Sequence, residues 1–130
     1  MKAFLKNYRQ SPRKVRLVAD LVRGKKVNDA LARLDFAAKR ASLPIKKLLL
    51  SAVANAKQSG ATEENLFVKE IRVDKGVTMK RIMPAAMGSA HRINKRTSQV
   101  VLILGEKIAK AKAVKTEKKE AKTKSKTVKK

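Results

Sequence analysis

Cysteine and tryptophan are absent from the 130 residues, and aromatic residues make up only 3% of the chain. Without cysteine, neither a disulfide framework nor a thiolate metal site can form, so stability must come from packing and from binding partners. The few aromatics disfavour modules that bind single-stranded nucleic acid by stacking several bases. His91 is the single histidine, which leaves no metal cluster and no serine–histidine pair to propose. We therefore predict no metal, no cofactor and no catalytic activity.

Long apolar runs are also missing. The longest, residues 48–50 and 100–104, have the length of a helix face or a strand, far below the ~18 residues of a bilayer span. The N-terminal residues lack the apolar stretch of a secretory signal, and Tyr8, Pro12 and Asp20 argue against a transit peptide. We expect a chain that crosses no membrane and stays in the cytoplasm.

Acidic residues are scarce: Asp and Glu total 10 against 34 Lys and Arg, for a formal net charge of +24. A compact state with that much charge of one sign is destabilised by its own field, so a polyanionic partner is expected. Nucleic acid is the first candidate. An anionic membrane surface is the second, and it would need an amphipathic helix with bulky apolar anchors.

Charge and composition divide the chain into a body and a tail. Residues 1–104 carry a net charge of +16 with a mixed composition, which suits one domain with a modest core. Residues 105–130 carry a net charge of +8, and their composition is dominated by Lys, Ala, Glu, Thr, Val and Ser, from which no core can be built. We predict a single domain over residues 1–104 and a basic tail, disordered when free, over residues 105–130.

Apolar periodicity predicts three helices in the body. The first begins at Ser11-Pro12, with the Ser11 side chain as its cap, and ends at Gly24. Its inward stripe comprises Val15, Val18, Ala19 and Val22, widened by Leu21.

The second helix is expected to run from a cap at Asn28 to about Phe36, with Leu31 and Leu34 turned inward. The third has Pro44 in its first turn and ends at residues 59–60. Its buried face comprises Ile45, Leu48, Leu49, Ala52, Val53 and Ala56.

Strand signals occur at residues 2–8, at residues 66–73 with a bulge near Lys69-Glu70, and at residues 97–104. Residues 74–96 lie between the last two strands and lack the apolar periodicity that would pack them on a core. An antiparallel hairpin arm with its reversal at residues 84–88 is therefore expected, and Gly76 and Gly88 are expected to make turns. Because a long hairpin is unstable alone in water, a partner must hold it.

Five stretches of this chain are similar to one known family. They are SPRKVRLVADLVRGKK at residues 11–26, SAVANA at 51–56, VDKG at 73–76, MKRIMP at 79–84 and RINKRTS at 92–98. The chain resembles the bacterial large-subunit ribosomal protein L-twenty-two family over residues 3–104. The resemblance implies an α+β fold: three helices packed on a small antiparallel sheet, with a long protruding β-hairpin. It also implies a structural constituent of the large ribosomal subunit that binds rRNA and supports subunit assembly, with the arm lining the nascent-peptide exit tunnel.

Neighbouring ribosomal proteins and the nascent peptide would then be further partners, in the ribosome. Charge and resemblance together give the expected rRNA-binding residues: Arg13, Lys14, Arg16, Arg23, Lys25, Lys26, Lys80, Arg81, Arg92, Lys95 and Arg96. The expected tunnel-facing tip comprises Met83, Pro84, Ala85, Ala86, Met87, Gly88 and Ser89, which departs from the family in having no basic residue.

These assignments have alternatives, both for the single residues and for the function. Arg13, Arg16 and Arg23 share one helix face, which suits phosphate binding but also a merely solvated surface. A DNA-compacting architectural protein is the alternative function, since basic helices and a Lys/Ala-rich tail also suit duplex DNA. Against it, a minor-groove wedge normally ends in an apolar intercalator or an arginine, whereas this tip offers Pro84-Ala85-Ala86-Met87-Gly88. An enzyme would need a reactive constellation, and the sequence contains none that we recognise.

Overall fold

A computed structural model describes residues 1–106, so the predicted basic tail lies outside the described residues from residue 107 onward. The last strand ends at Glu106, two residues beyond the boundary expected from composition. The α+β class is confirmed, with the elements β1 (Lys2–Tyr8), α1 (Pro12–Val22), α2 (Val27–Phe36), α3 (Ser42–Gln58), β2 (Leu66–Pro84) and β3 (Ala90–Glu106).

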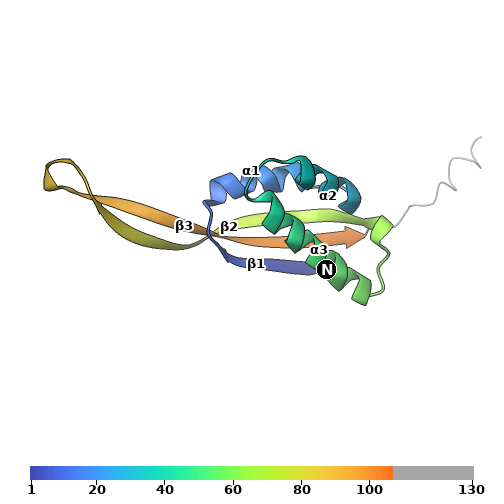
Figure 1. Ribbon diagram of the computed structural model, residues 1–130. Helices are drawn as coiled ribbons and strands as arrows, with labels where there is room; N and C mark the ends of the chain where they lie inside the picture. The colour runs from blue at the N-terminus through green and yellow to red at the C-terminus, as the bar shows by residue number, and fades with distance from the viewer. Residues whose placement is uncertain (107–130) are drawn as a thin grey trace, which may run out of the picture.

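The sheet is antiparallel, with β3 in the centre and β1 and β2 at its edges. The helices cover one face of it (Figure 1). Along β3, Val100, Leu102 and Leu104 are buried and their neighbours are not, so alternate residues face the helices. The opposite face is open, and Phe4 on it is 60% exposed. One core therefore lies between the helices and the sheet.

α1 buries Val15, Val18, Ala19 and Val22, as predicted, but Leu21 is 42% exposed. At 100° per residue, position 21 lies about 120° from the centre of the buried stripe, too far round the helix to reach the core. The Ser11 side chain does not cap the helix; only its backbone carbonyl accepts hydrogen bonds from the amides of the first turn.

α2 begins at Val27, so Asn28 lies within the helix and is not its cap. Leu34 is buried as expected, whereas Leu31 is only partly buried. In α3, all six predicted apolar residues are buried and Pro44 lies in the first turn. The helix ends at Gln58, directly before the predicted stop at residues 59–60, and Gly60 has a φ of +83°. These two helices complete the cover over the sheet.

The arm is the outer part of the β2–β3 hairpin, which pairs out to Pro84 and Ala90 with two register shifts on the way (Figure 1). The bulge predicted near Lys69-Glu70 is confirmed by a register shift between Val68 and Glu70. Every residue from 81 to 90 is exposed. The outer arm therefore contains no core of its own, and its stability depends on backbone pairing and on whatever surrounds it.

Gly76 lies within β2, where the register shifts a second time between Lys75 and Thr78, and it does not make the turn that we expected. A Cβ on Gly76 would overlap Oγ1 of Thr97, which donates a hydrogen bond to the Val77 carbonyl at 2.7 Å. The absence of a side chain thus lets β2 and β3 approach closely where the arm leaves the body. Gly88 does lie in the reversal, with a φ of +68°.

Candidate nucleic-acid interface

Five cations lie along the paired strands of the arm, and none faces another across the hairpin. The cross-strand pairs are Lys80 with Asn94, Arg81 with Ile93, Arg92 with Ile82, Lys95 with Met79 and Arg96 with Thr78. Like charges directly opposite each other destabilise a strand pair, so this register keeps repulsion low. The arm can therefore carry a high density of positive charge and still pair.

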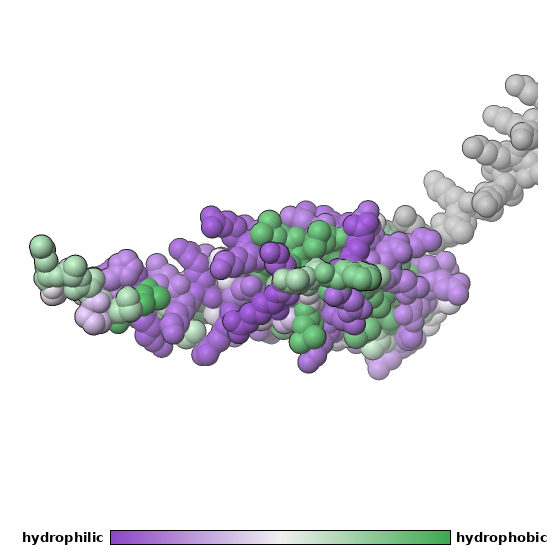
Figure 2. Space-filling view, turned by 45° about the horizontal axis from the view of Figure 1, so that its top comes forward, coloured by the Kyte–Doolittle hydropathy of each residue, from purple (hydrophilic) through white to green (hydrophobic). Residues whose placement is uncertain are grey.

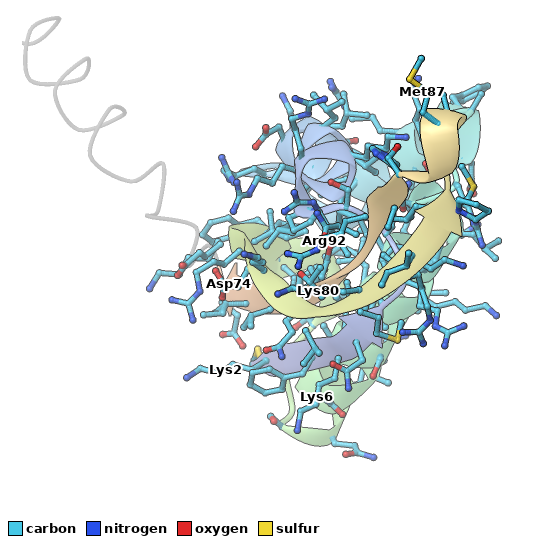
Figure 3. The ribbon with its side chains drawn as sticks, turned by 90° about the vertical axis from the view of Figure 1, so that its left-hand side faces the viewer. Lys2, Lys6, Asp74, Lys80, Met87 and Arg92 are labelled. Carbon is cyan, nitrogen blue, oxygen red and sulfur yellow. The ribbon has the colours of Figure 1, made fainter. Side chains whose placement is uncertain are left out.

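These five cations divide between the two faces of the arm. Because side chains alternate along a strand, Arg81 and Lys95 lie on one face, and Lys80, Arg92 and Arg96 lie on the other. Figure 3, which looks along the arm toward the body, places Lys80 and Arg92 side by side, as the diagonal register requires. Both faces can thus meet phosphate groups.

Among residues 1–106, no carboxylate forms an ion pair with the arm cations. Residues 75–105 contain no Asp or Glu. The ion pairs among residues 1–106 are Asp20–Arg23, Asp35–Lys46, Glu63–Lys57 and Asp74–Arg72, none of which reaches the arm cations. The charges of the arm are therefore available to an external anion.

Two of the three arginines predicted to bind phosphate, Arg16 on α1 and Arg23 directly after it, make contacts within the protein. The Arg16 guanidinium donates two hydrogen bonds to the Val73 carbonyl, from Nε at 3.2 Å and Nη2 at 2.9 Å. Arg23 donates to the Ile71 carbonyl at 3.2 Å. Both carbonyls lie on β2, which is an edge strand. The two arginines therefore donate to backbone acceptors that have no partner strand.

Lys25 and Lys26 belong to a segment that continues along the same edge. The Gly24 amide donates to the Val68 carbonyl at 3.0 Å, and the Val68 amide donates to the Lys25 carbonyl at 2.9 Å. Both lysine side chains remain exposed. The backbone of this segment is thus fixed while its charges stay at the surface.

A hollow lies where the arm meets the body, and we call it the elbow pocket. It has a volume of about 610 Å³ and is lined by Arg9, Gln10, Ser11, Arg40, Met79, Arg81, Asn94, Lys95 and Arg96. A second hollow of about 490 Å³ shares Ser11 and Arg96 with it and adds Pro12, Arg13, Lys14, Arg16 and Lys75. Predicted residues of the first helix and of the arm are therefore brought together.

Arg9 and Arg40 were missed in the sequence. They come from the β1–α1 and α2–α3 connections, 31 residues apart, and carry no periodic or motif signal. The Tyr8 hydroxyl donates to the Arg40 carbonyl at 3.3 Å and holds the α2–α3 connection against the end of β1, next to Arg9. Only the folded chain places these two cations beside the base of the arm.

The tip, residues 83–89, differs chemically from the paired part of the arm that carries it, which we call the stem. Figure 2 shows a mostly hydrophilic stem and a pale to hydrophobic tip. All seven predicted tip residues are exposed, and Met87 projects from the end of the arm (Figure 3). The reversal places Met87 and Gly88 in the left-handed region and closes with the Ala85 amide donating to the Ser89 carbonyl at 2.9 Å.

The described residues offer little for other kinds of site. Within residues 1–106, no three His, Cys, Asp or Glu side chains gather in a way that could hold a metal ion. None of the helices described here has both the length and the apolarity needed to cross a bilayer. A small α+β body with a cationic arm that no carboxylate among these residues pairs with is typical of the class of nucleic-acid-binding proteins.

Comparison with known proteins identifies the family within that class. The family model for ribosomal protein L22p/L17e matches residues 3–105. Similar relatives, each named large ribosomal subunit protein uL22, come from Flavobacterium johnsoniae, 54% identical over 79% of this chain and 78% of the relative, and Christiangramia forsetii, 56% identical over 79% of each. A third, from Desulfitobacterium hafniense, is 53% identical over 82% of this chain and 94% of the relative. The chain therefore belongs to the ribosomal protein L22p/L17e family, whose members are structural proteins and not enzymes.

Proposed function

We propose that this chain is a structural constituent of the large ribosomal subunit, where it binds rRNA, contacts neighbouring ribosomal proteins and supports assembly. rRNA binding and lining of the exit tunnel are the known roles of its family, and the relatives described above carry the large subunit in their names. Family membership also argues against the DNA-compacting and enzymatic alternatives.

The observation that carries the proposal is the uncompensated charge on both faces of the arm. Lys80, Arg92 and Arg96 on one face, and Arg81 and Lys95 on the other, have no carboxylate partner among residues 1–106. An arm that lay along a single surface would need charge on one face only. Cations on both faces suit an arm that is enclosed by folded RNA.

On the body, Arg13, Lys14, Lys25 and Lys26 are exposed and are the stronger candidates for phosphate contact. Arg16 and Arg23 contribute mainly by holding the edge of β2, although an arginine has five N–H donors and Arg16 uses two for Val73. We assign these two residues a mixed role. Their remaining donors can still take a phosphate oxygen.

The tip, residues 83–89, would face the nascent peptide. An uncharged tip neither attracts nor repels a charged segment of a passing peptide strongly, because Coulomb energy requires charge on both partners. The stem would thus provide attachment to RNA, and the tip a neutral part of the tunnel wall. This division follows the chemical change along the arm (Figure 2).

A crosslinking experiment in ribosomes tests the proposal. A photoreactive amino acid at Met87 should crosslink to a stalled nascent peptide, whereas the same group at Leu17, which is 65% exposed on α1, should not. The tagged chain should also sediment with large subunits. A chain that sedimented away from large subunits would overturn the proposal, and a Met87 probe that reached only RNA would remove the tunnel assignment.

A further inference from the structure

Gln10, which lines the elbow pocket, carries a side-chain acceptor that the protein does not use. The Gln10 side-chain oxygen Oε1 is buried and has no partner among the described residues. The backbone of Gln10 is held by two hydrogen bonds. Its amide donates to the Tyr8 carbonyl at 2.8 Å, and its carbonyl accepts from Ser98 Oγ. A buried acceptor without a donor has a cost to the folded protein. A ligand that donates to it would recover that cost.

The lining of the pocket fits one ligand chemistry. Arg9, Arg40, Arg81, Lys95 and Arg96 supply positive charge, Gln10, Ser11 and Asn94 supply neutral polar groups, and Met79 supplies an apolar surface. Among the described residues, no carboxylate lines it. A ligand that is anionic at one end and is a flat, hydrogen-bonding body at the other matches this set, and a nucleotide has that form.

The shape of the pocket favours a single nucleotide over a duplex. Its volume of about 610 Å³ falls in the ~300–1,000 Å³ range of sites that enclose small ligands. A paired helix presents its phosphates on a convex surface and keeps its bases stacked inside, so it cannot fill such a hollow. An unpaired nucleotide can enter base first. With no aromatic residue in the lining, its base would stack on a guanidinium plane or on Met79.

We propose that the elbow pocket binds one unpaired, unstacked nucleotide of RNA. The base enters the pocket, the Gln10 side chain turns Oε1 toward it, and the exocyclic amino group of the base donates to that oxygen. Arg9, Arg40 and Arg96 take the phosphates at the rim. This rests on the proposed function and deepens it, because it names the RNA element recognised. The pocket joins residues of the body to residues of the arm, so the bound nucleotide also fixes the arm on the body.

The test uses the purified full-length chain and synthetic RNA stems that are fully paired or carry one bulged nucleotide. The bulge is either adenosine or purine riboside, which is the same base without the exocyclic amino group. Anisotropy titrations at constant salt should show about tenfold tighter binding of the adenosine bulge than of the paired stem, the value of one stacked base. Equal affinity for all stems would overturn the proposal.

The Gln10→Met variant keeps the side-chain length and removes the amide. The unaltered chain should prefer adenosine over purine riboside by about three- to tenfold, the value of one hydrogen bond, and the variant should lose that preference. It should still bind the paired stem as the unaltered chain does. A variant that kept the preference would exclude Gln10 as the acceptor and overturn the assignment.

A charge-matched pair separates the pocket from general electrostatics. Arg40→Gln removes a pocket cation, and Lys47→Gln removes an exposed cation of α3 outside the pocket. The first should weaken bulge binding severalfold more than paired-stem binding, and the second should weaken both equally. Identical effects of the two changes would count against the pocket. Sedimentation of the Gln10→Met chain with large subunits reports separately on the proposed function, which survives if only the pocket fails.

Discussion

The guanidinium of Arg16 donates two hydrogen bonds to the backbone carbonyl of Val73, from Nε at 3.2 Å and Nη2 at 2.9 Å. This contact joins α1 to the exposed edge of β2 just before the arm begins. A residue that the sequence marks only as basic thus also holds the fold together. Its neighbour Arg13 makes no such contact, so the two residues can be separated experimentally.

Arg16→Ala should lower the free energy of unfolding by about 1–2 kcal/mol, because the charged hydrogen bonds to Val73 are lost. Arg13→Ala is the matched control and should change stability by less than about 0.5 kcal/mol, as is usual for an exposed side chain. Urea titrations of both variants measure the difference. Equal stabilities of the two variants would show that the Val73 contact contributes nothing.

Gly76→Ala should destabilise the protein by about 1–3 kcal/mol, the usual cost of overpacking, because the new Cβ overlaps Thr97 Oγ1. Thr97→Ala alone should cost about 1 kcal/mol through the lost hydrogen bond to Val77. In the double variant the overlap is relieved, so its cost should be smaller than the sum of the single costs. Additive costs in this cycle would contradict the close approach.

Lys80→Ala and Arg92→Ala should each reduce the slope of log affinity against log salt by roughly 1, since each removes one phosphate contact. The change is measured on rRNA fragments at several salt concentrations. Lys47→Ala provides the control at an exposed position far along the chain from the arm. If all three variants shared one slope change, the arm would have no special part in binding.

Removing residues 107–130 takes away eleven lysines and two acids. The truncated chain should bind RNA more weakly and with a flatter salt dependence, because fewer counterions are released. Its unfolding free energy should stay the same, since no buried core residue of the described part lies beyond Leu104. A salt slope equal to that of the full chain would show that the removed residues do not contact phosphate.

The sequence predicts most of the fold because apolar spacing is a local signal. Ile45 and Leu49 define the buried face of α3 without any knowledge of what covers it. Helix caps were less predictable. Neither Ser11 nor Asn28 uses its side chain as a cap, since tertiary packing fixes where these helices begin and outweighs the modest energy of a cap.

The candidate site is only partly visible in the sequence. Basic residues are apparent, but the division of the arm cations between two faces depends on the cross-strand register, which the second bulge near Gly76 alters. Arg9, Gln10 and Arg40 lie in connections between elements, where no periodicity exists to mark them. Only the fold shows that Arg16 contacts Val73 and that Gln10 has an unused acceptor.

A density map of an intact large subunit that contains this chain measures the central claim most directly. We predict an ordered arm with RNA phosphates within hydrogen-bonding distance on both faces, at Lys80 or Arg92 on one and at Arg81 or Lys95 on the other. An ordered arm whose cations faced solvent or protein carboxylates would contradict this account.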